Sequence, residues 1–135
     1  MNHFISNIYW KSFENALRVL LAIGGSTNGI IHLTAMAGRL GIEVDLPAFD
    51  ALGVDTPVLV DLKPNGQFYM DDLHRAGGMA PILRALKPLL HLGCLTVTGR
   101  TLGEEIDAMP AAFPQMVVRS LDDPIHAGGG IAFLR

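Results

Sequence analysis

Glycine and proline divide this sequence into short segments, and that division constrains the fold more than any other feature. Glycine reaches positive φ at little cost, and proline lacks a backbone N–H, so both residues end helices and open turns. The expected breaks fall at Gly24-Gly25, Gly41, Pro64-Asn65-Gly66, Gly77-Gly78, Pro88 and Pro110. The 135 residues are enough for one domain. We therefore expect a single domain of short elements joined by tight turns.

Apolar residues at helical spacing predict where the helices lie. Phe13, Leu17 and Leu21 share one helical face behind a possible cap at Ser12. A second helix, capped by Ser26 or Thr27 and ended by Gly41, carries apolar residues on several faces, so we expect it to be buried on more than one side. Further helices are expected at residues 47–52, 70–76, 82–86 and after the capping box Thr101-Leu102-Gly103-Glu104.

Runs rich in β-branched residues predict short strands at residues 57–62, 95–98 and 116–119. Helices that alternate with short strands indicate an α/β fold. Between the first of these strands and the following helix, Pro64-Asn65-Gly66 is expected to be a turn in which Gly66 takes a positive φ. Residues 1–11 show no clear period and are left unassigned.

Composition excludes several classes of protein. Half of the residues are hydrophobic, so a packed core is expected, and the net charge of −3 does not favour nucleic acid or anionic membranes as partners. One cysteine excludes a disulfide framework, and the five histidines do not cluster as metal ligands. No stretch is long and apolar enough for a membrane span, and no secretory signal is visible, so the cytoplasm is the expected setting.

A charged fraction of 17% is low for an independent domain, since about 25% is usual. Such a composition is typical of the inside of something larger.

The stretch from Gly24 to Asn28 is the best candidate for a binding site. Two glycines allow the backbone to approach a ligand closely, and a helix start offers free N–H groups and a positive dipole end. The candidate substrate-binding residues are Gly25, Ser26, Thr27, Asn28 and His32. The alternative interpretation is a capped helix–helix turn, with His32 as a core histidine.

Two other groups of residues have structural alternatives of their own. Asp71 and Asp72 could bind a metal, although adjacent helical residues point apart and a solvated helix start explains them as well. Cys94 is expected to be a buried, inert thiol, since an iron–sulfur site normally needs several cysteines.

Ordered motifs along the chain resemble the central part of the dihydroxy-acid dehydratase/phosphogluconate dehydratase family, and they cover nearly everything from Ser12 to Arg135. These motifs are Ser12-Phe13-Glu14-Asn15-Ala16, Gly24-Gly25-Ser26-Thr27-Asn28, His32-Leu33, Pro57 with Leu59, Leu62-Lys63-Pro64-Asn65-Gly66, Met70-Asp71-Asp72-Leu73, Gly77-Gly78, Leu95-Thr96-Val97-Thr98-Gly99-Arg100-Thr101-Leu102, Leu121-Asp122-Asp123-Pro124-Ile125 and Gly129-Gly130-Ile131-Ala132. Sugar-acid and branched-chain members of the family share these stretches, so they do not identify the member.

The resemblance implies a hydro-lyase that converts 2,3-dihydroxy acids to 2-keto acids. It further implies an iron–sulfur cluster acting on the leaving hydroxyl, a magnesium ion at the substrate carboxylate and a serine base that takes the C2 proton. In the family, the cluster cysteines, the acidic magnesium ligand and a modified lysine lie upstream of the matching stretch. The serine and a metal-binding glutamate lie downstream, in a β-rich domain. Cys94 matches no cluster position, so no catalytic residue or metal ligand is assigned here.

The resemblance also sets the expected domain organisation. Residues 12–120 would form an α/β segment of the N-terminal dehydratase domain, and residues 121–135 would begin the region between the two domains. The chain would then be a fragment, inactive alone, without its own cofactor, and partnered by the rest of a dehydratase that is itself a homo-oligomer. The alternatives are a non-catalytic binding or interaction module and a truncated product without function.

Overall fold

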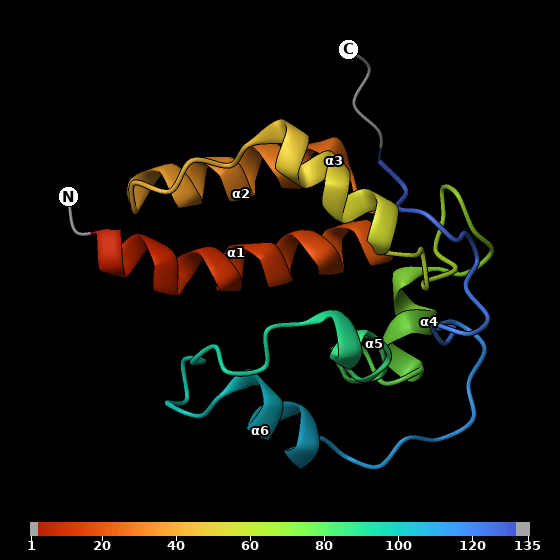
Figure 1. Cartoon of the computed structure of the whole chain (residues 1–135). Coiled ribbons are helices and arrows are strands. Elements are labelled where there is room, and N and C mark those ends of the chain that lie inside the picture. The colour runs from red at the N-terminus through yellow and green to blue at the C-terminus, as the bar shows by residue number, and fades with distance from the viewer. Residues whose placement is uncertain (1–2, 132–135) are drawn as a thin grey trace.

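The computed structural model describes the backbone of residues 3–131 and the side chains of residues 9–131, so the apolar end predicted at residues 132–135 lies outside it. The described part is rich in helices (Figure 1). They are α1 (His3–Ala22), α2 (Thr27–Arg39), α3 (Leu46–Asp55), α4 (Met70–Arg75), α5 (Met79–Leu86), the 3-10 helix η1 (Lys87–Leu89) and α6 (Leu102–Ala108). The breaks predicted at the glycine pairs and prolines separate these helices.

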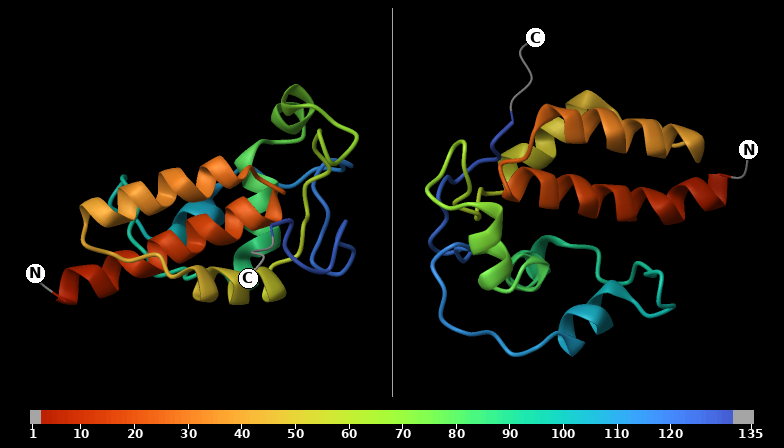
Figure 2. Two further views of the ribbon diagram at one scale, coloured as in Figure 1. Left: turned by 90° about the horizontal axis from the view of Figure 1, so that it is seen from above. Right: turned by 180° about the vertical axis from the view of Figure 1, so that it is seen from behind.

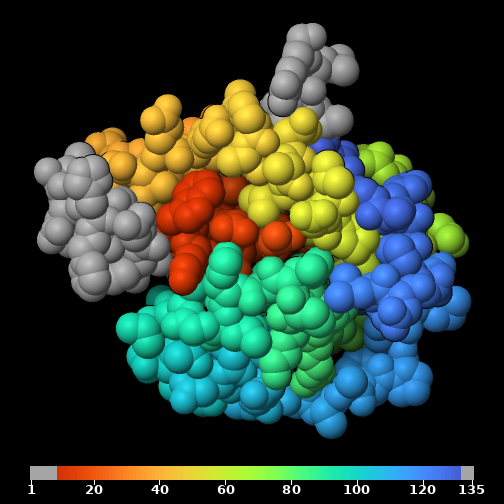
Figure 3. Space-filling view, viewed as in Figure 1, coloured from red at the N-terminus to blue at the C-terminus, as the bar shows by residue number. Residues whose placement is uncertain are grey.

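Helix α1 lies between two layers of structure and connects them. It packs against α2 and α3 on one side and against α5 on the other, and α5 packs against α6 (Figure 2). In the space-filling view, α1 is visible as a band between the α2–α3 layer above and the α5–α6 layer below (Figure 3). Two hydrophobic clusters therefore share one helix.

The two clusters use different faces of α1. Leu17 and Leu21 pack with Ile30 of α2 and Phe49 of α3 in the upper cluster. Ala22 joins the lower cluster, which also contains Leu59, Val60, Leu73, Ala76, Ile82, Leu86, Leu90, Ile106, Val117 and Val118. Because α1 is apolar toward both layers, it is the element on which the rest of the chain is assembled.

The prediction that Ser12 begins the first helix is wrong. Helix α1 starts at His3, and Ser12 lies in its middle. The physical reason is that Trp10 extends the apolar face of Phe13 and Leu17 by one more turn and packs on the upper cluster. Residues 3–11, left unassigned from sequence, are therefore helical.

The short strands expected from sequence are not confirmed as strands. Within the described residues they pair only through single β-bridges, such as Val58 with His126 and Val60 with Val118. A continuous ladder does not form because the backbone N–H groups of Leu59 and Val60 donate instead to the Ala22 carbonyl, at 2.8 and 3.3 Å. The helices of the α/β expectation are therefore present. In place of its strands there are extended segments that pair through single bridges and contribute Leu59, Val60, Val117 and Val118 to the lower cluster.

Helix α2 is not buried on more than one side in the described structure, contrary to the expectation. It packs mainly against α1, and Ile30 and Ala37 are its buried residues. Ile31 and Met36 lie on the opposite faces and are 64% and 53% exposed. These two apolar side chains are thus not buried by the packing of the described residues.

Gly66 does not take the positive φ expected of it. Among the described residues, that conformation is found at Gly24, Gly41, Gly77, Gly78 and Gly99. A side chain is excluded at Gly66 for a different reason. A Cβ there would lie 2.3 Å from Asp61 Oδ1 and 2.5 Å from the Asp61 carbonyl carbon. The turn therefore needs glycine for space rather than for its dihedral angle.

The capping box predicted at Thr101 is confirmed. Thr101 Oγ1 accepts a hydrogen bond from the Glu104 N–H at 3.2 Å, and Glu104 Oε2 accepts from the Thr101 N–H at 2.7 Å. Hydrogen bonds from the backbone and hydroxyl of Thr101 hold the pKa of Glu104 below its ordinary value.

Replacing Thr101 by Ala should raise the pKa of Glu104 and lower the melting temperature, because one of the two donors and the cap are lost. Since the folded pKa is depressed, the stabilisation is present above the ordinary value of 4.5 and disappears as pH falls through the lowered pKa. The Thr101→Ser variant keeps the hydroxyl and is the control. An NMR titration of the Glu104 side chain measures the shift, and an unchanged pKa in Thr101→Ala would refute the assignment.

No helix in the described part of the chain combines the length and the apolar character that a bilayer crossing requires.

Candidate functional site

The start of α2 has the geometry of an anion-binding helix terminus. Ser26 is the N-cap residue, as predicted, with an extended backbone, and its Oγ accepts a hydrogen bond from the Asn28 N–H at 3.2 Å. The helix dipole places partial positive charge at this end, and the backbone N–H groups of the first turn point outward from it. The Asn28 and Gly29 N–H groups both donate to Ser26, to its Oγ and to its carbonyl, so an anionic group placed here would meet the N–H of Thr27 and the side chains of the first turn.

The polar side chains predicted for this site lie together at the surface. Thr27 and Asn28 are exposed in the first turn of α2, and their side chains form no hydrogen bond with the described residues. His32 lies one turn further on the same side of the helix and is also exposed. His32 is therefore not part of the core of the described structure, and the three side chains are free to meet a ligand or another part of a protein.

Gly25 has a packing role that the sequence did not indicate. A Cβ at Gly25 would lie 2.3 Å from Leu20 Cδ1 and 3.1 Å from the Leu20 carbonyl oxygen, and one at Gly29 would lie 2.7 Å from the same Cδ1. The two glycines thus let α2 rest directly on Leu20 of α1. This contact explains Gly25 without any ligand, and the donors of the site are Ser26, Thr27 and Asn28.

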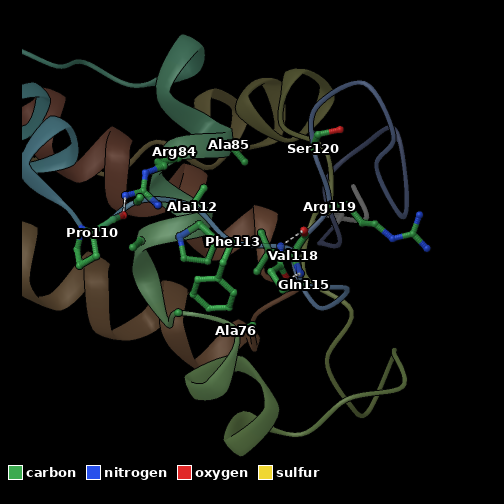
Figure 4. Close-up of a pocket in the computed structure, with 14 residues that line it drawn as sticks. Ala76, Arg84, Ala85, Pro110, Ala112, Phe113, Gln115, Val118, Arg119 and Ser120 are labelled. Atoms are coloured by element: carbon green, nitrogen blue, oxygen red, sulfur yellow. Dashed lines mark hydrogen bonds between the residues drawn. The ribbon is translucent and has the colours of Figure 1, made fainter.

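A larger cavity than those near the start of α2 lies elsewhere. It has a volume of about 380 Å³ and lies between α5 and the segment of residues 110–120 (Figure 4). Phe113 and alanine side chains line it, while Arg84 donates to the Pro110 carbonyl and Gln115 is bonded to the backbone of Val118. Arg84 and Gln115 are thus bonded to the protein itself, and the cavity contains none of the predicted site residues.

The residues present do not fit a metal ion or an iron–sulfur cluster. Among the described residues, no three His, Cys, Asp or Glu side chains come together as a possible metal site. Asp71 pairs with Arg75 at 2.6 Å, and Asp72 accepts from the Tyr69 N–H at 2.8 Å, so both serve the helix start. Cys94 is half-buried and receives an N–H from Asn15 at 3.7 Å.

Asn15 and Asp61 are among the buried polar residues that were not singled out from sequence. Asn15, in α1, binds the backbone of His91 through both side-chain atoms, and Asp61 is a buried carboxylate at the end of an extended segment. A signal was available for each of them. Asn15 is an amide directly before the apolar pair Ala16-Leu17 of α1, and Asp61 interrupts an otherwise apolar run from Pro57 to Leu62.

Comparison with known proteins identifies the family. The model of the dihydroxy-acid/6-phosphogluconate dehydratase N-terminal region matches residues 6–105. Dihydroxy-acid dehydratase 1 of Methanosarcina acetivorans is 44% identical over 128 residues, which cover 93% of this chain and 23% of the relative. The dihydroxy-acid dehydratases of Methanothrix thermoacetophila and Clavibacter michiganensis are each 45% identical, over 93% and 92% of this chain and 23% and 22% of theirs.

The family model and the similar proteins place this chain among the dehydratases. The chain belongs to the dihydroxy-acid/6-phosphogluconate dehydratase family, as the ordered motifs predicted. It spans about a quarter of the length of the curated relatives it matches.

Proposed function

We propose that these residues act within a dehydratase that removes water from 2,3-dihydroxy acids to give 2-keto acids. In that reaction the C2–H and C3–O bonds break, the hydroxyl leaves as water, and the resulting enol becomes the ketone. The names of the similar proteins and the match to the family's N-terminal region support this assignment. Within the enzyme, residues 12–120 would belong to the N-terminal domain and residues 121–135 to the region that follows.

The specific role we assign is to the start of α2, which would bind the carboxylate of the substrate. The observation that carries this role is the exposed cap at Ser26, with the unbonded side chains of Thr27 and Asn28 beside it. A helix N-terminus stabilises an anion through its N–H groups and its dipole without a counter-ion. His32, one turn away, would add a donor on the same side.

The partners in this proposal are the rest of a dehydratase polypeptide and further copies of the complete enzyme. The exposed apolar side chains of α2, Ile31 and Met36 among them, are suited to burial against such additional protein. Their exposure supports the proposal because large apolar surfaces that stay in water are costly.

The proposal is tested with a hybrid enzyme and with the chain alone. In the hybrid, residues 6–131 of this chain replace the matching stretch of one full-length relative. We expect the hybrid to form keto acid from 2,3-dihydroxy-3-methylbutanoate after anaerobic iron–sulfur reconstitution. The 135-residue chain, treated in the same way, should stay colourless and form none, because it has one cysteine and no assigned base.

Either half of this experiment can contradict the proposal. A folded hybrid that binds its cluster but forms no keto acid would remove these residues from dehydratase function. Cluster absorbance and keto-acid formation by the 135-residue chain would overturn the expectation that it is inactive alone. The unmodified relative, reconstituted in parallel, is the control for incorporation of the iron–sulfur cluster.

A further inference from the structure

Asp61 is a buried carboxylate whose charge the surrounding protein compensates only in part. Asp61 is 7% exposed, and its Oδ1 accepts a hydrogen bond from the Gln67 N–H at 3.0 Å. Its Oδ2 accepts none from the described residues, and no cation among them forms an ion pair with it. Oδ2 is not among the fully buried side-chain atoms that lack a partner, so it is an acceptor that a ligand donor can still reach.

The positive groups nearest in the fold are directed elsewhere. Arg119 lines a second cavity beside Asp61, but its Nη1 pairs with Asp123 Oδ2 at 2.8 Å. Lys63, two residues along the chain, places its Nζ 4.8 Å from the centre of the Tyr69 ring. Neither cation therefore supplies the missing interaction.

Asp61 lines a partly open cavity of about 150 Å³ whose wall is more apolar than polar. Asn65 and His126 add an amide and an imidazole to its lining. The remaining wall consists of five apolar side chains and three glycines, namely Ile23, Val58, Val60, Leu62, Ile125, Gly24, Gly66 and Gly130. A Cβ at Gly130 would lie 3.2 Å from Gly24 Cα, so the wall is close-packed backbone. The volume is about five times the ~30 Å³ that one water molecule occupies in the liquid, which suits a ligand of a few non-hydrogen atoms.

The cavity is next to the start of α2 along the chain. Gly24 lines the cavity, and Ser26, the cap of α2, follows two residues later. Two residues span about 7 Å at most, so a small molecule can reach from one to the other. The α2 end offers N–H donors that suit a carboxylate, whereas Asp61 offers an acceptor that suits a hydroxyl and repels a second anion.

We propose that the cavity over Asp61 binds the hydroxyl-bearing part of a small hydroxy acid, with Asp61 Oδ2 accepting a hydrogen bond from a ligand hydroxyl. This inference rests on the proposed function for the class of ligand, and it assigns to that function a site that the sequence did not reveal. Asp61 thereby favours ligands that carry a hydroxyl next to the carboxylate over plain carboxylic acids. Asn65 and His126 are positioned to bond the same part of the ligand.

The test is an NMR titration of the 135-residue chain with two probes of equal charge, 2,3-dihydroxypropanoate and propanoate. We expect the dihydroxy acid to bind about tenfold more tightly, which is the value of one hydrogen bond to a charged group. Its shifts should include the amides of Gly24, Gly66 and Gly130. In Asp61→Asn this preference should fall to about twofold or less, while Asp107→Asn, an exposed acid on α6, should keep it.

The outcomes separate this inference from the dehydratase proposal. Equal binding of the two probes, shifts confined to other residues, or an unchanged preference in Asp61→Asn would overturn the Asp61 site. If Asp61→Asn no longer folds, as shown by the loss of its dispersed amide spectrum, the exposed Asn65→Ala variant replaces it in the test. In Asn65→Ala the preference for the dihydroxy acid should fall about threefold, and an unchanged preference would contradict the inference. The titration measures binding and not turnover. Its result for the Asp61 site therefore stands even if the hybrid enzyme proves inactive.

Discussion

Replacing Thr27 or Asn28 by Ala in the hybrid dehydratase should lower kcat/KM about 10²–10³-fold. The physical reason is that each side chain lies unbonded beside the positive end of α2, where a developing or bound anion would be stabilised. Losing one preorganised donor to such an anion costs about 2.7–4 kcal/mol of transition-state stabilisation. Steady-state kinetics on each variant, together with a thermal melt, measures both consequences.

Stability distinguishes this role from a structural one. The cap itself is Ser26, so Thr27→Ala and Asn28→Ala leave the hydrogen bond to the Asn28 N–H in place and should hardly change the melting temperature. Thr34→Ala, at another exposed position of α2, is the matched control and should be fully active. If activity falls only in proportion to stability in the Thr27 and Asn28 variants, the start of α2 is a helix–helix connection and nothing more.

Replacing Asn15 by Ala should lower the free energy of unfolding of the 135-residue chain by about 3 kcal/mol. Asn15 Nδ2 donates to the His91 carbonyl at 3.0 Å, and Asn15 Oδ1 accepts from the His91 N–H at 2.8 Å. The substitution removes both hydrogen bonds and leaves two partly buried backbone groups without partners. Because Asn15 joins α1 to a residue 76 positions away, the loss should loosen the lower layer.

Urea unfolding measures this loss, and two other variants calibrate it. Asn28→Ala, an exposed amide on α2, should change the free energy of unfolding by less than about 0.5 kcal/mol. Asn15→Asp keeps the acceptor and loses the donor, so its effect should lie between the two. A loss in Asn15→Ala no larger than that of Asn28→Ala would show that the bonds to His91 do not hold the layers together.

Local chemistry in the sequence was sufficient for several features. Ser26 and Thr101 are caps because their hydroxyls reach N–H groups two or three residues away, and that reach depends on no distant contact. The breaks at Gly41 and Gly77-Gly78 follow from positive φ, which is also a local property. The ordered motifs also identified the family, which the comparisons confirmed.

Other expectations failed where a distant group decided the outcome. The run from Pro57 to Leu62 predicted a strand, yet the Ala22 carbonyl takes two of its N–H groups and prevents a ladder. Gly66 was assigned to a positive φ, while the actual constraint is the carboxylate of Asp61. His32 fits a core histidine by its apolar neighbours, but α2 packs mainly on α1 and leaves it exposed.

The sequence by itself therefore determined the helix boundaries set by caps and glycines, the family and the donors at the start of α2, because each depends on residues a few positions apart. The tertiary structure alone decided that α1 lies between two layers, that Asn15 binds His91 and that Asp61 is buried beside Gly24 and His126. Those pairings join residues tens of positions apart, and their energies depend on desolvation and close packing, which exist only once the chain has folded.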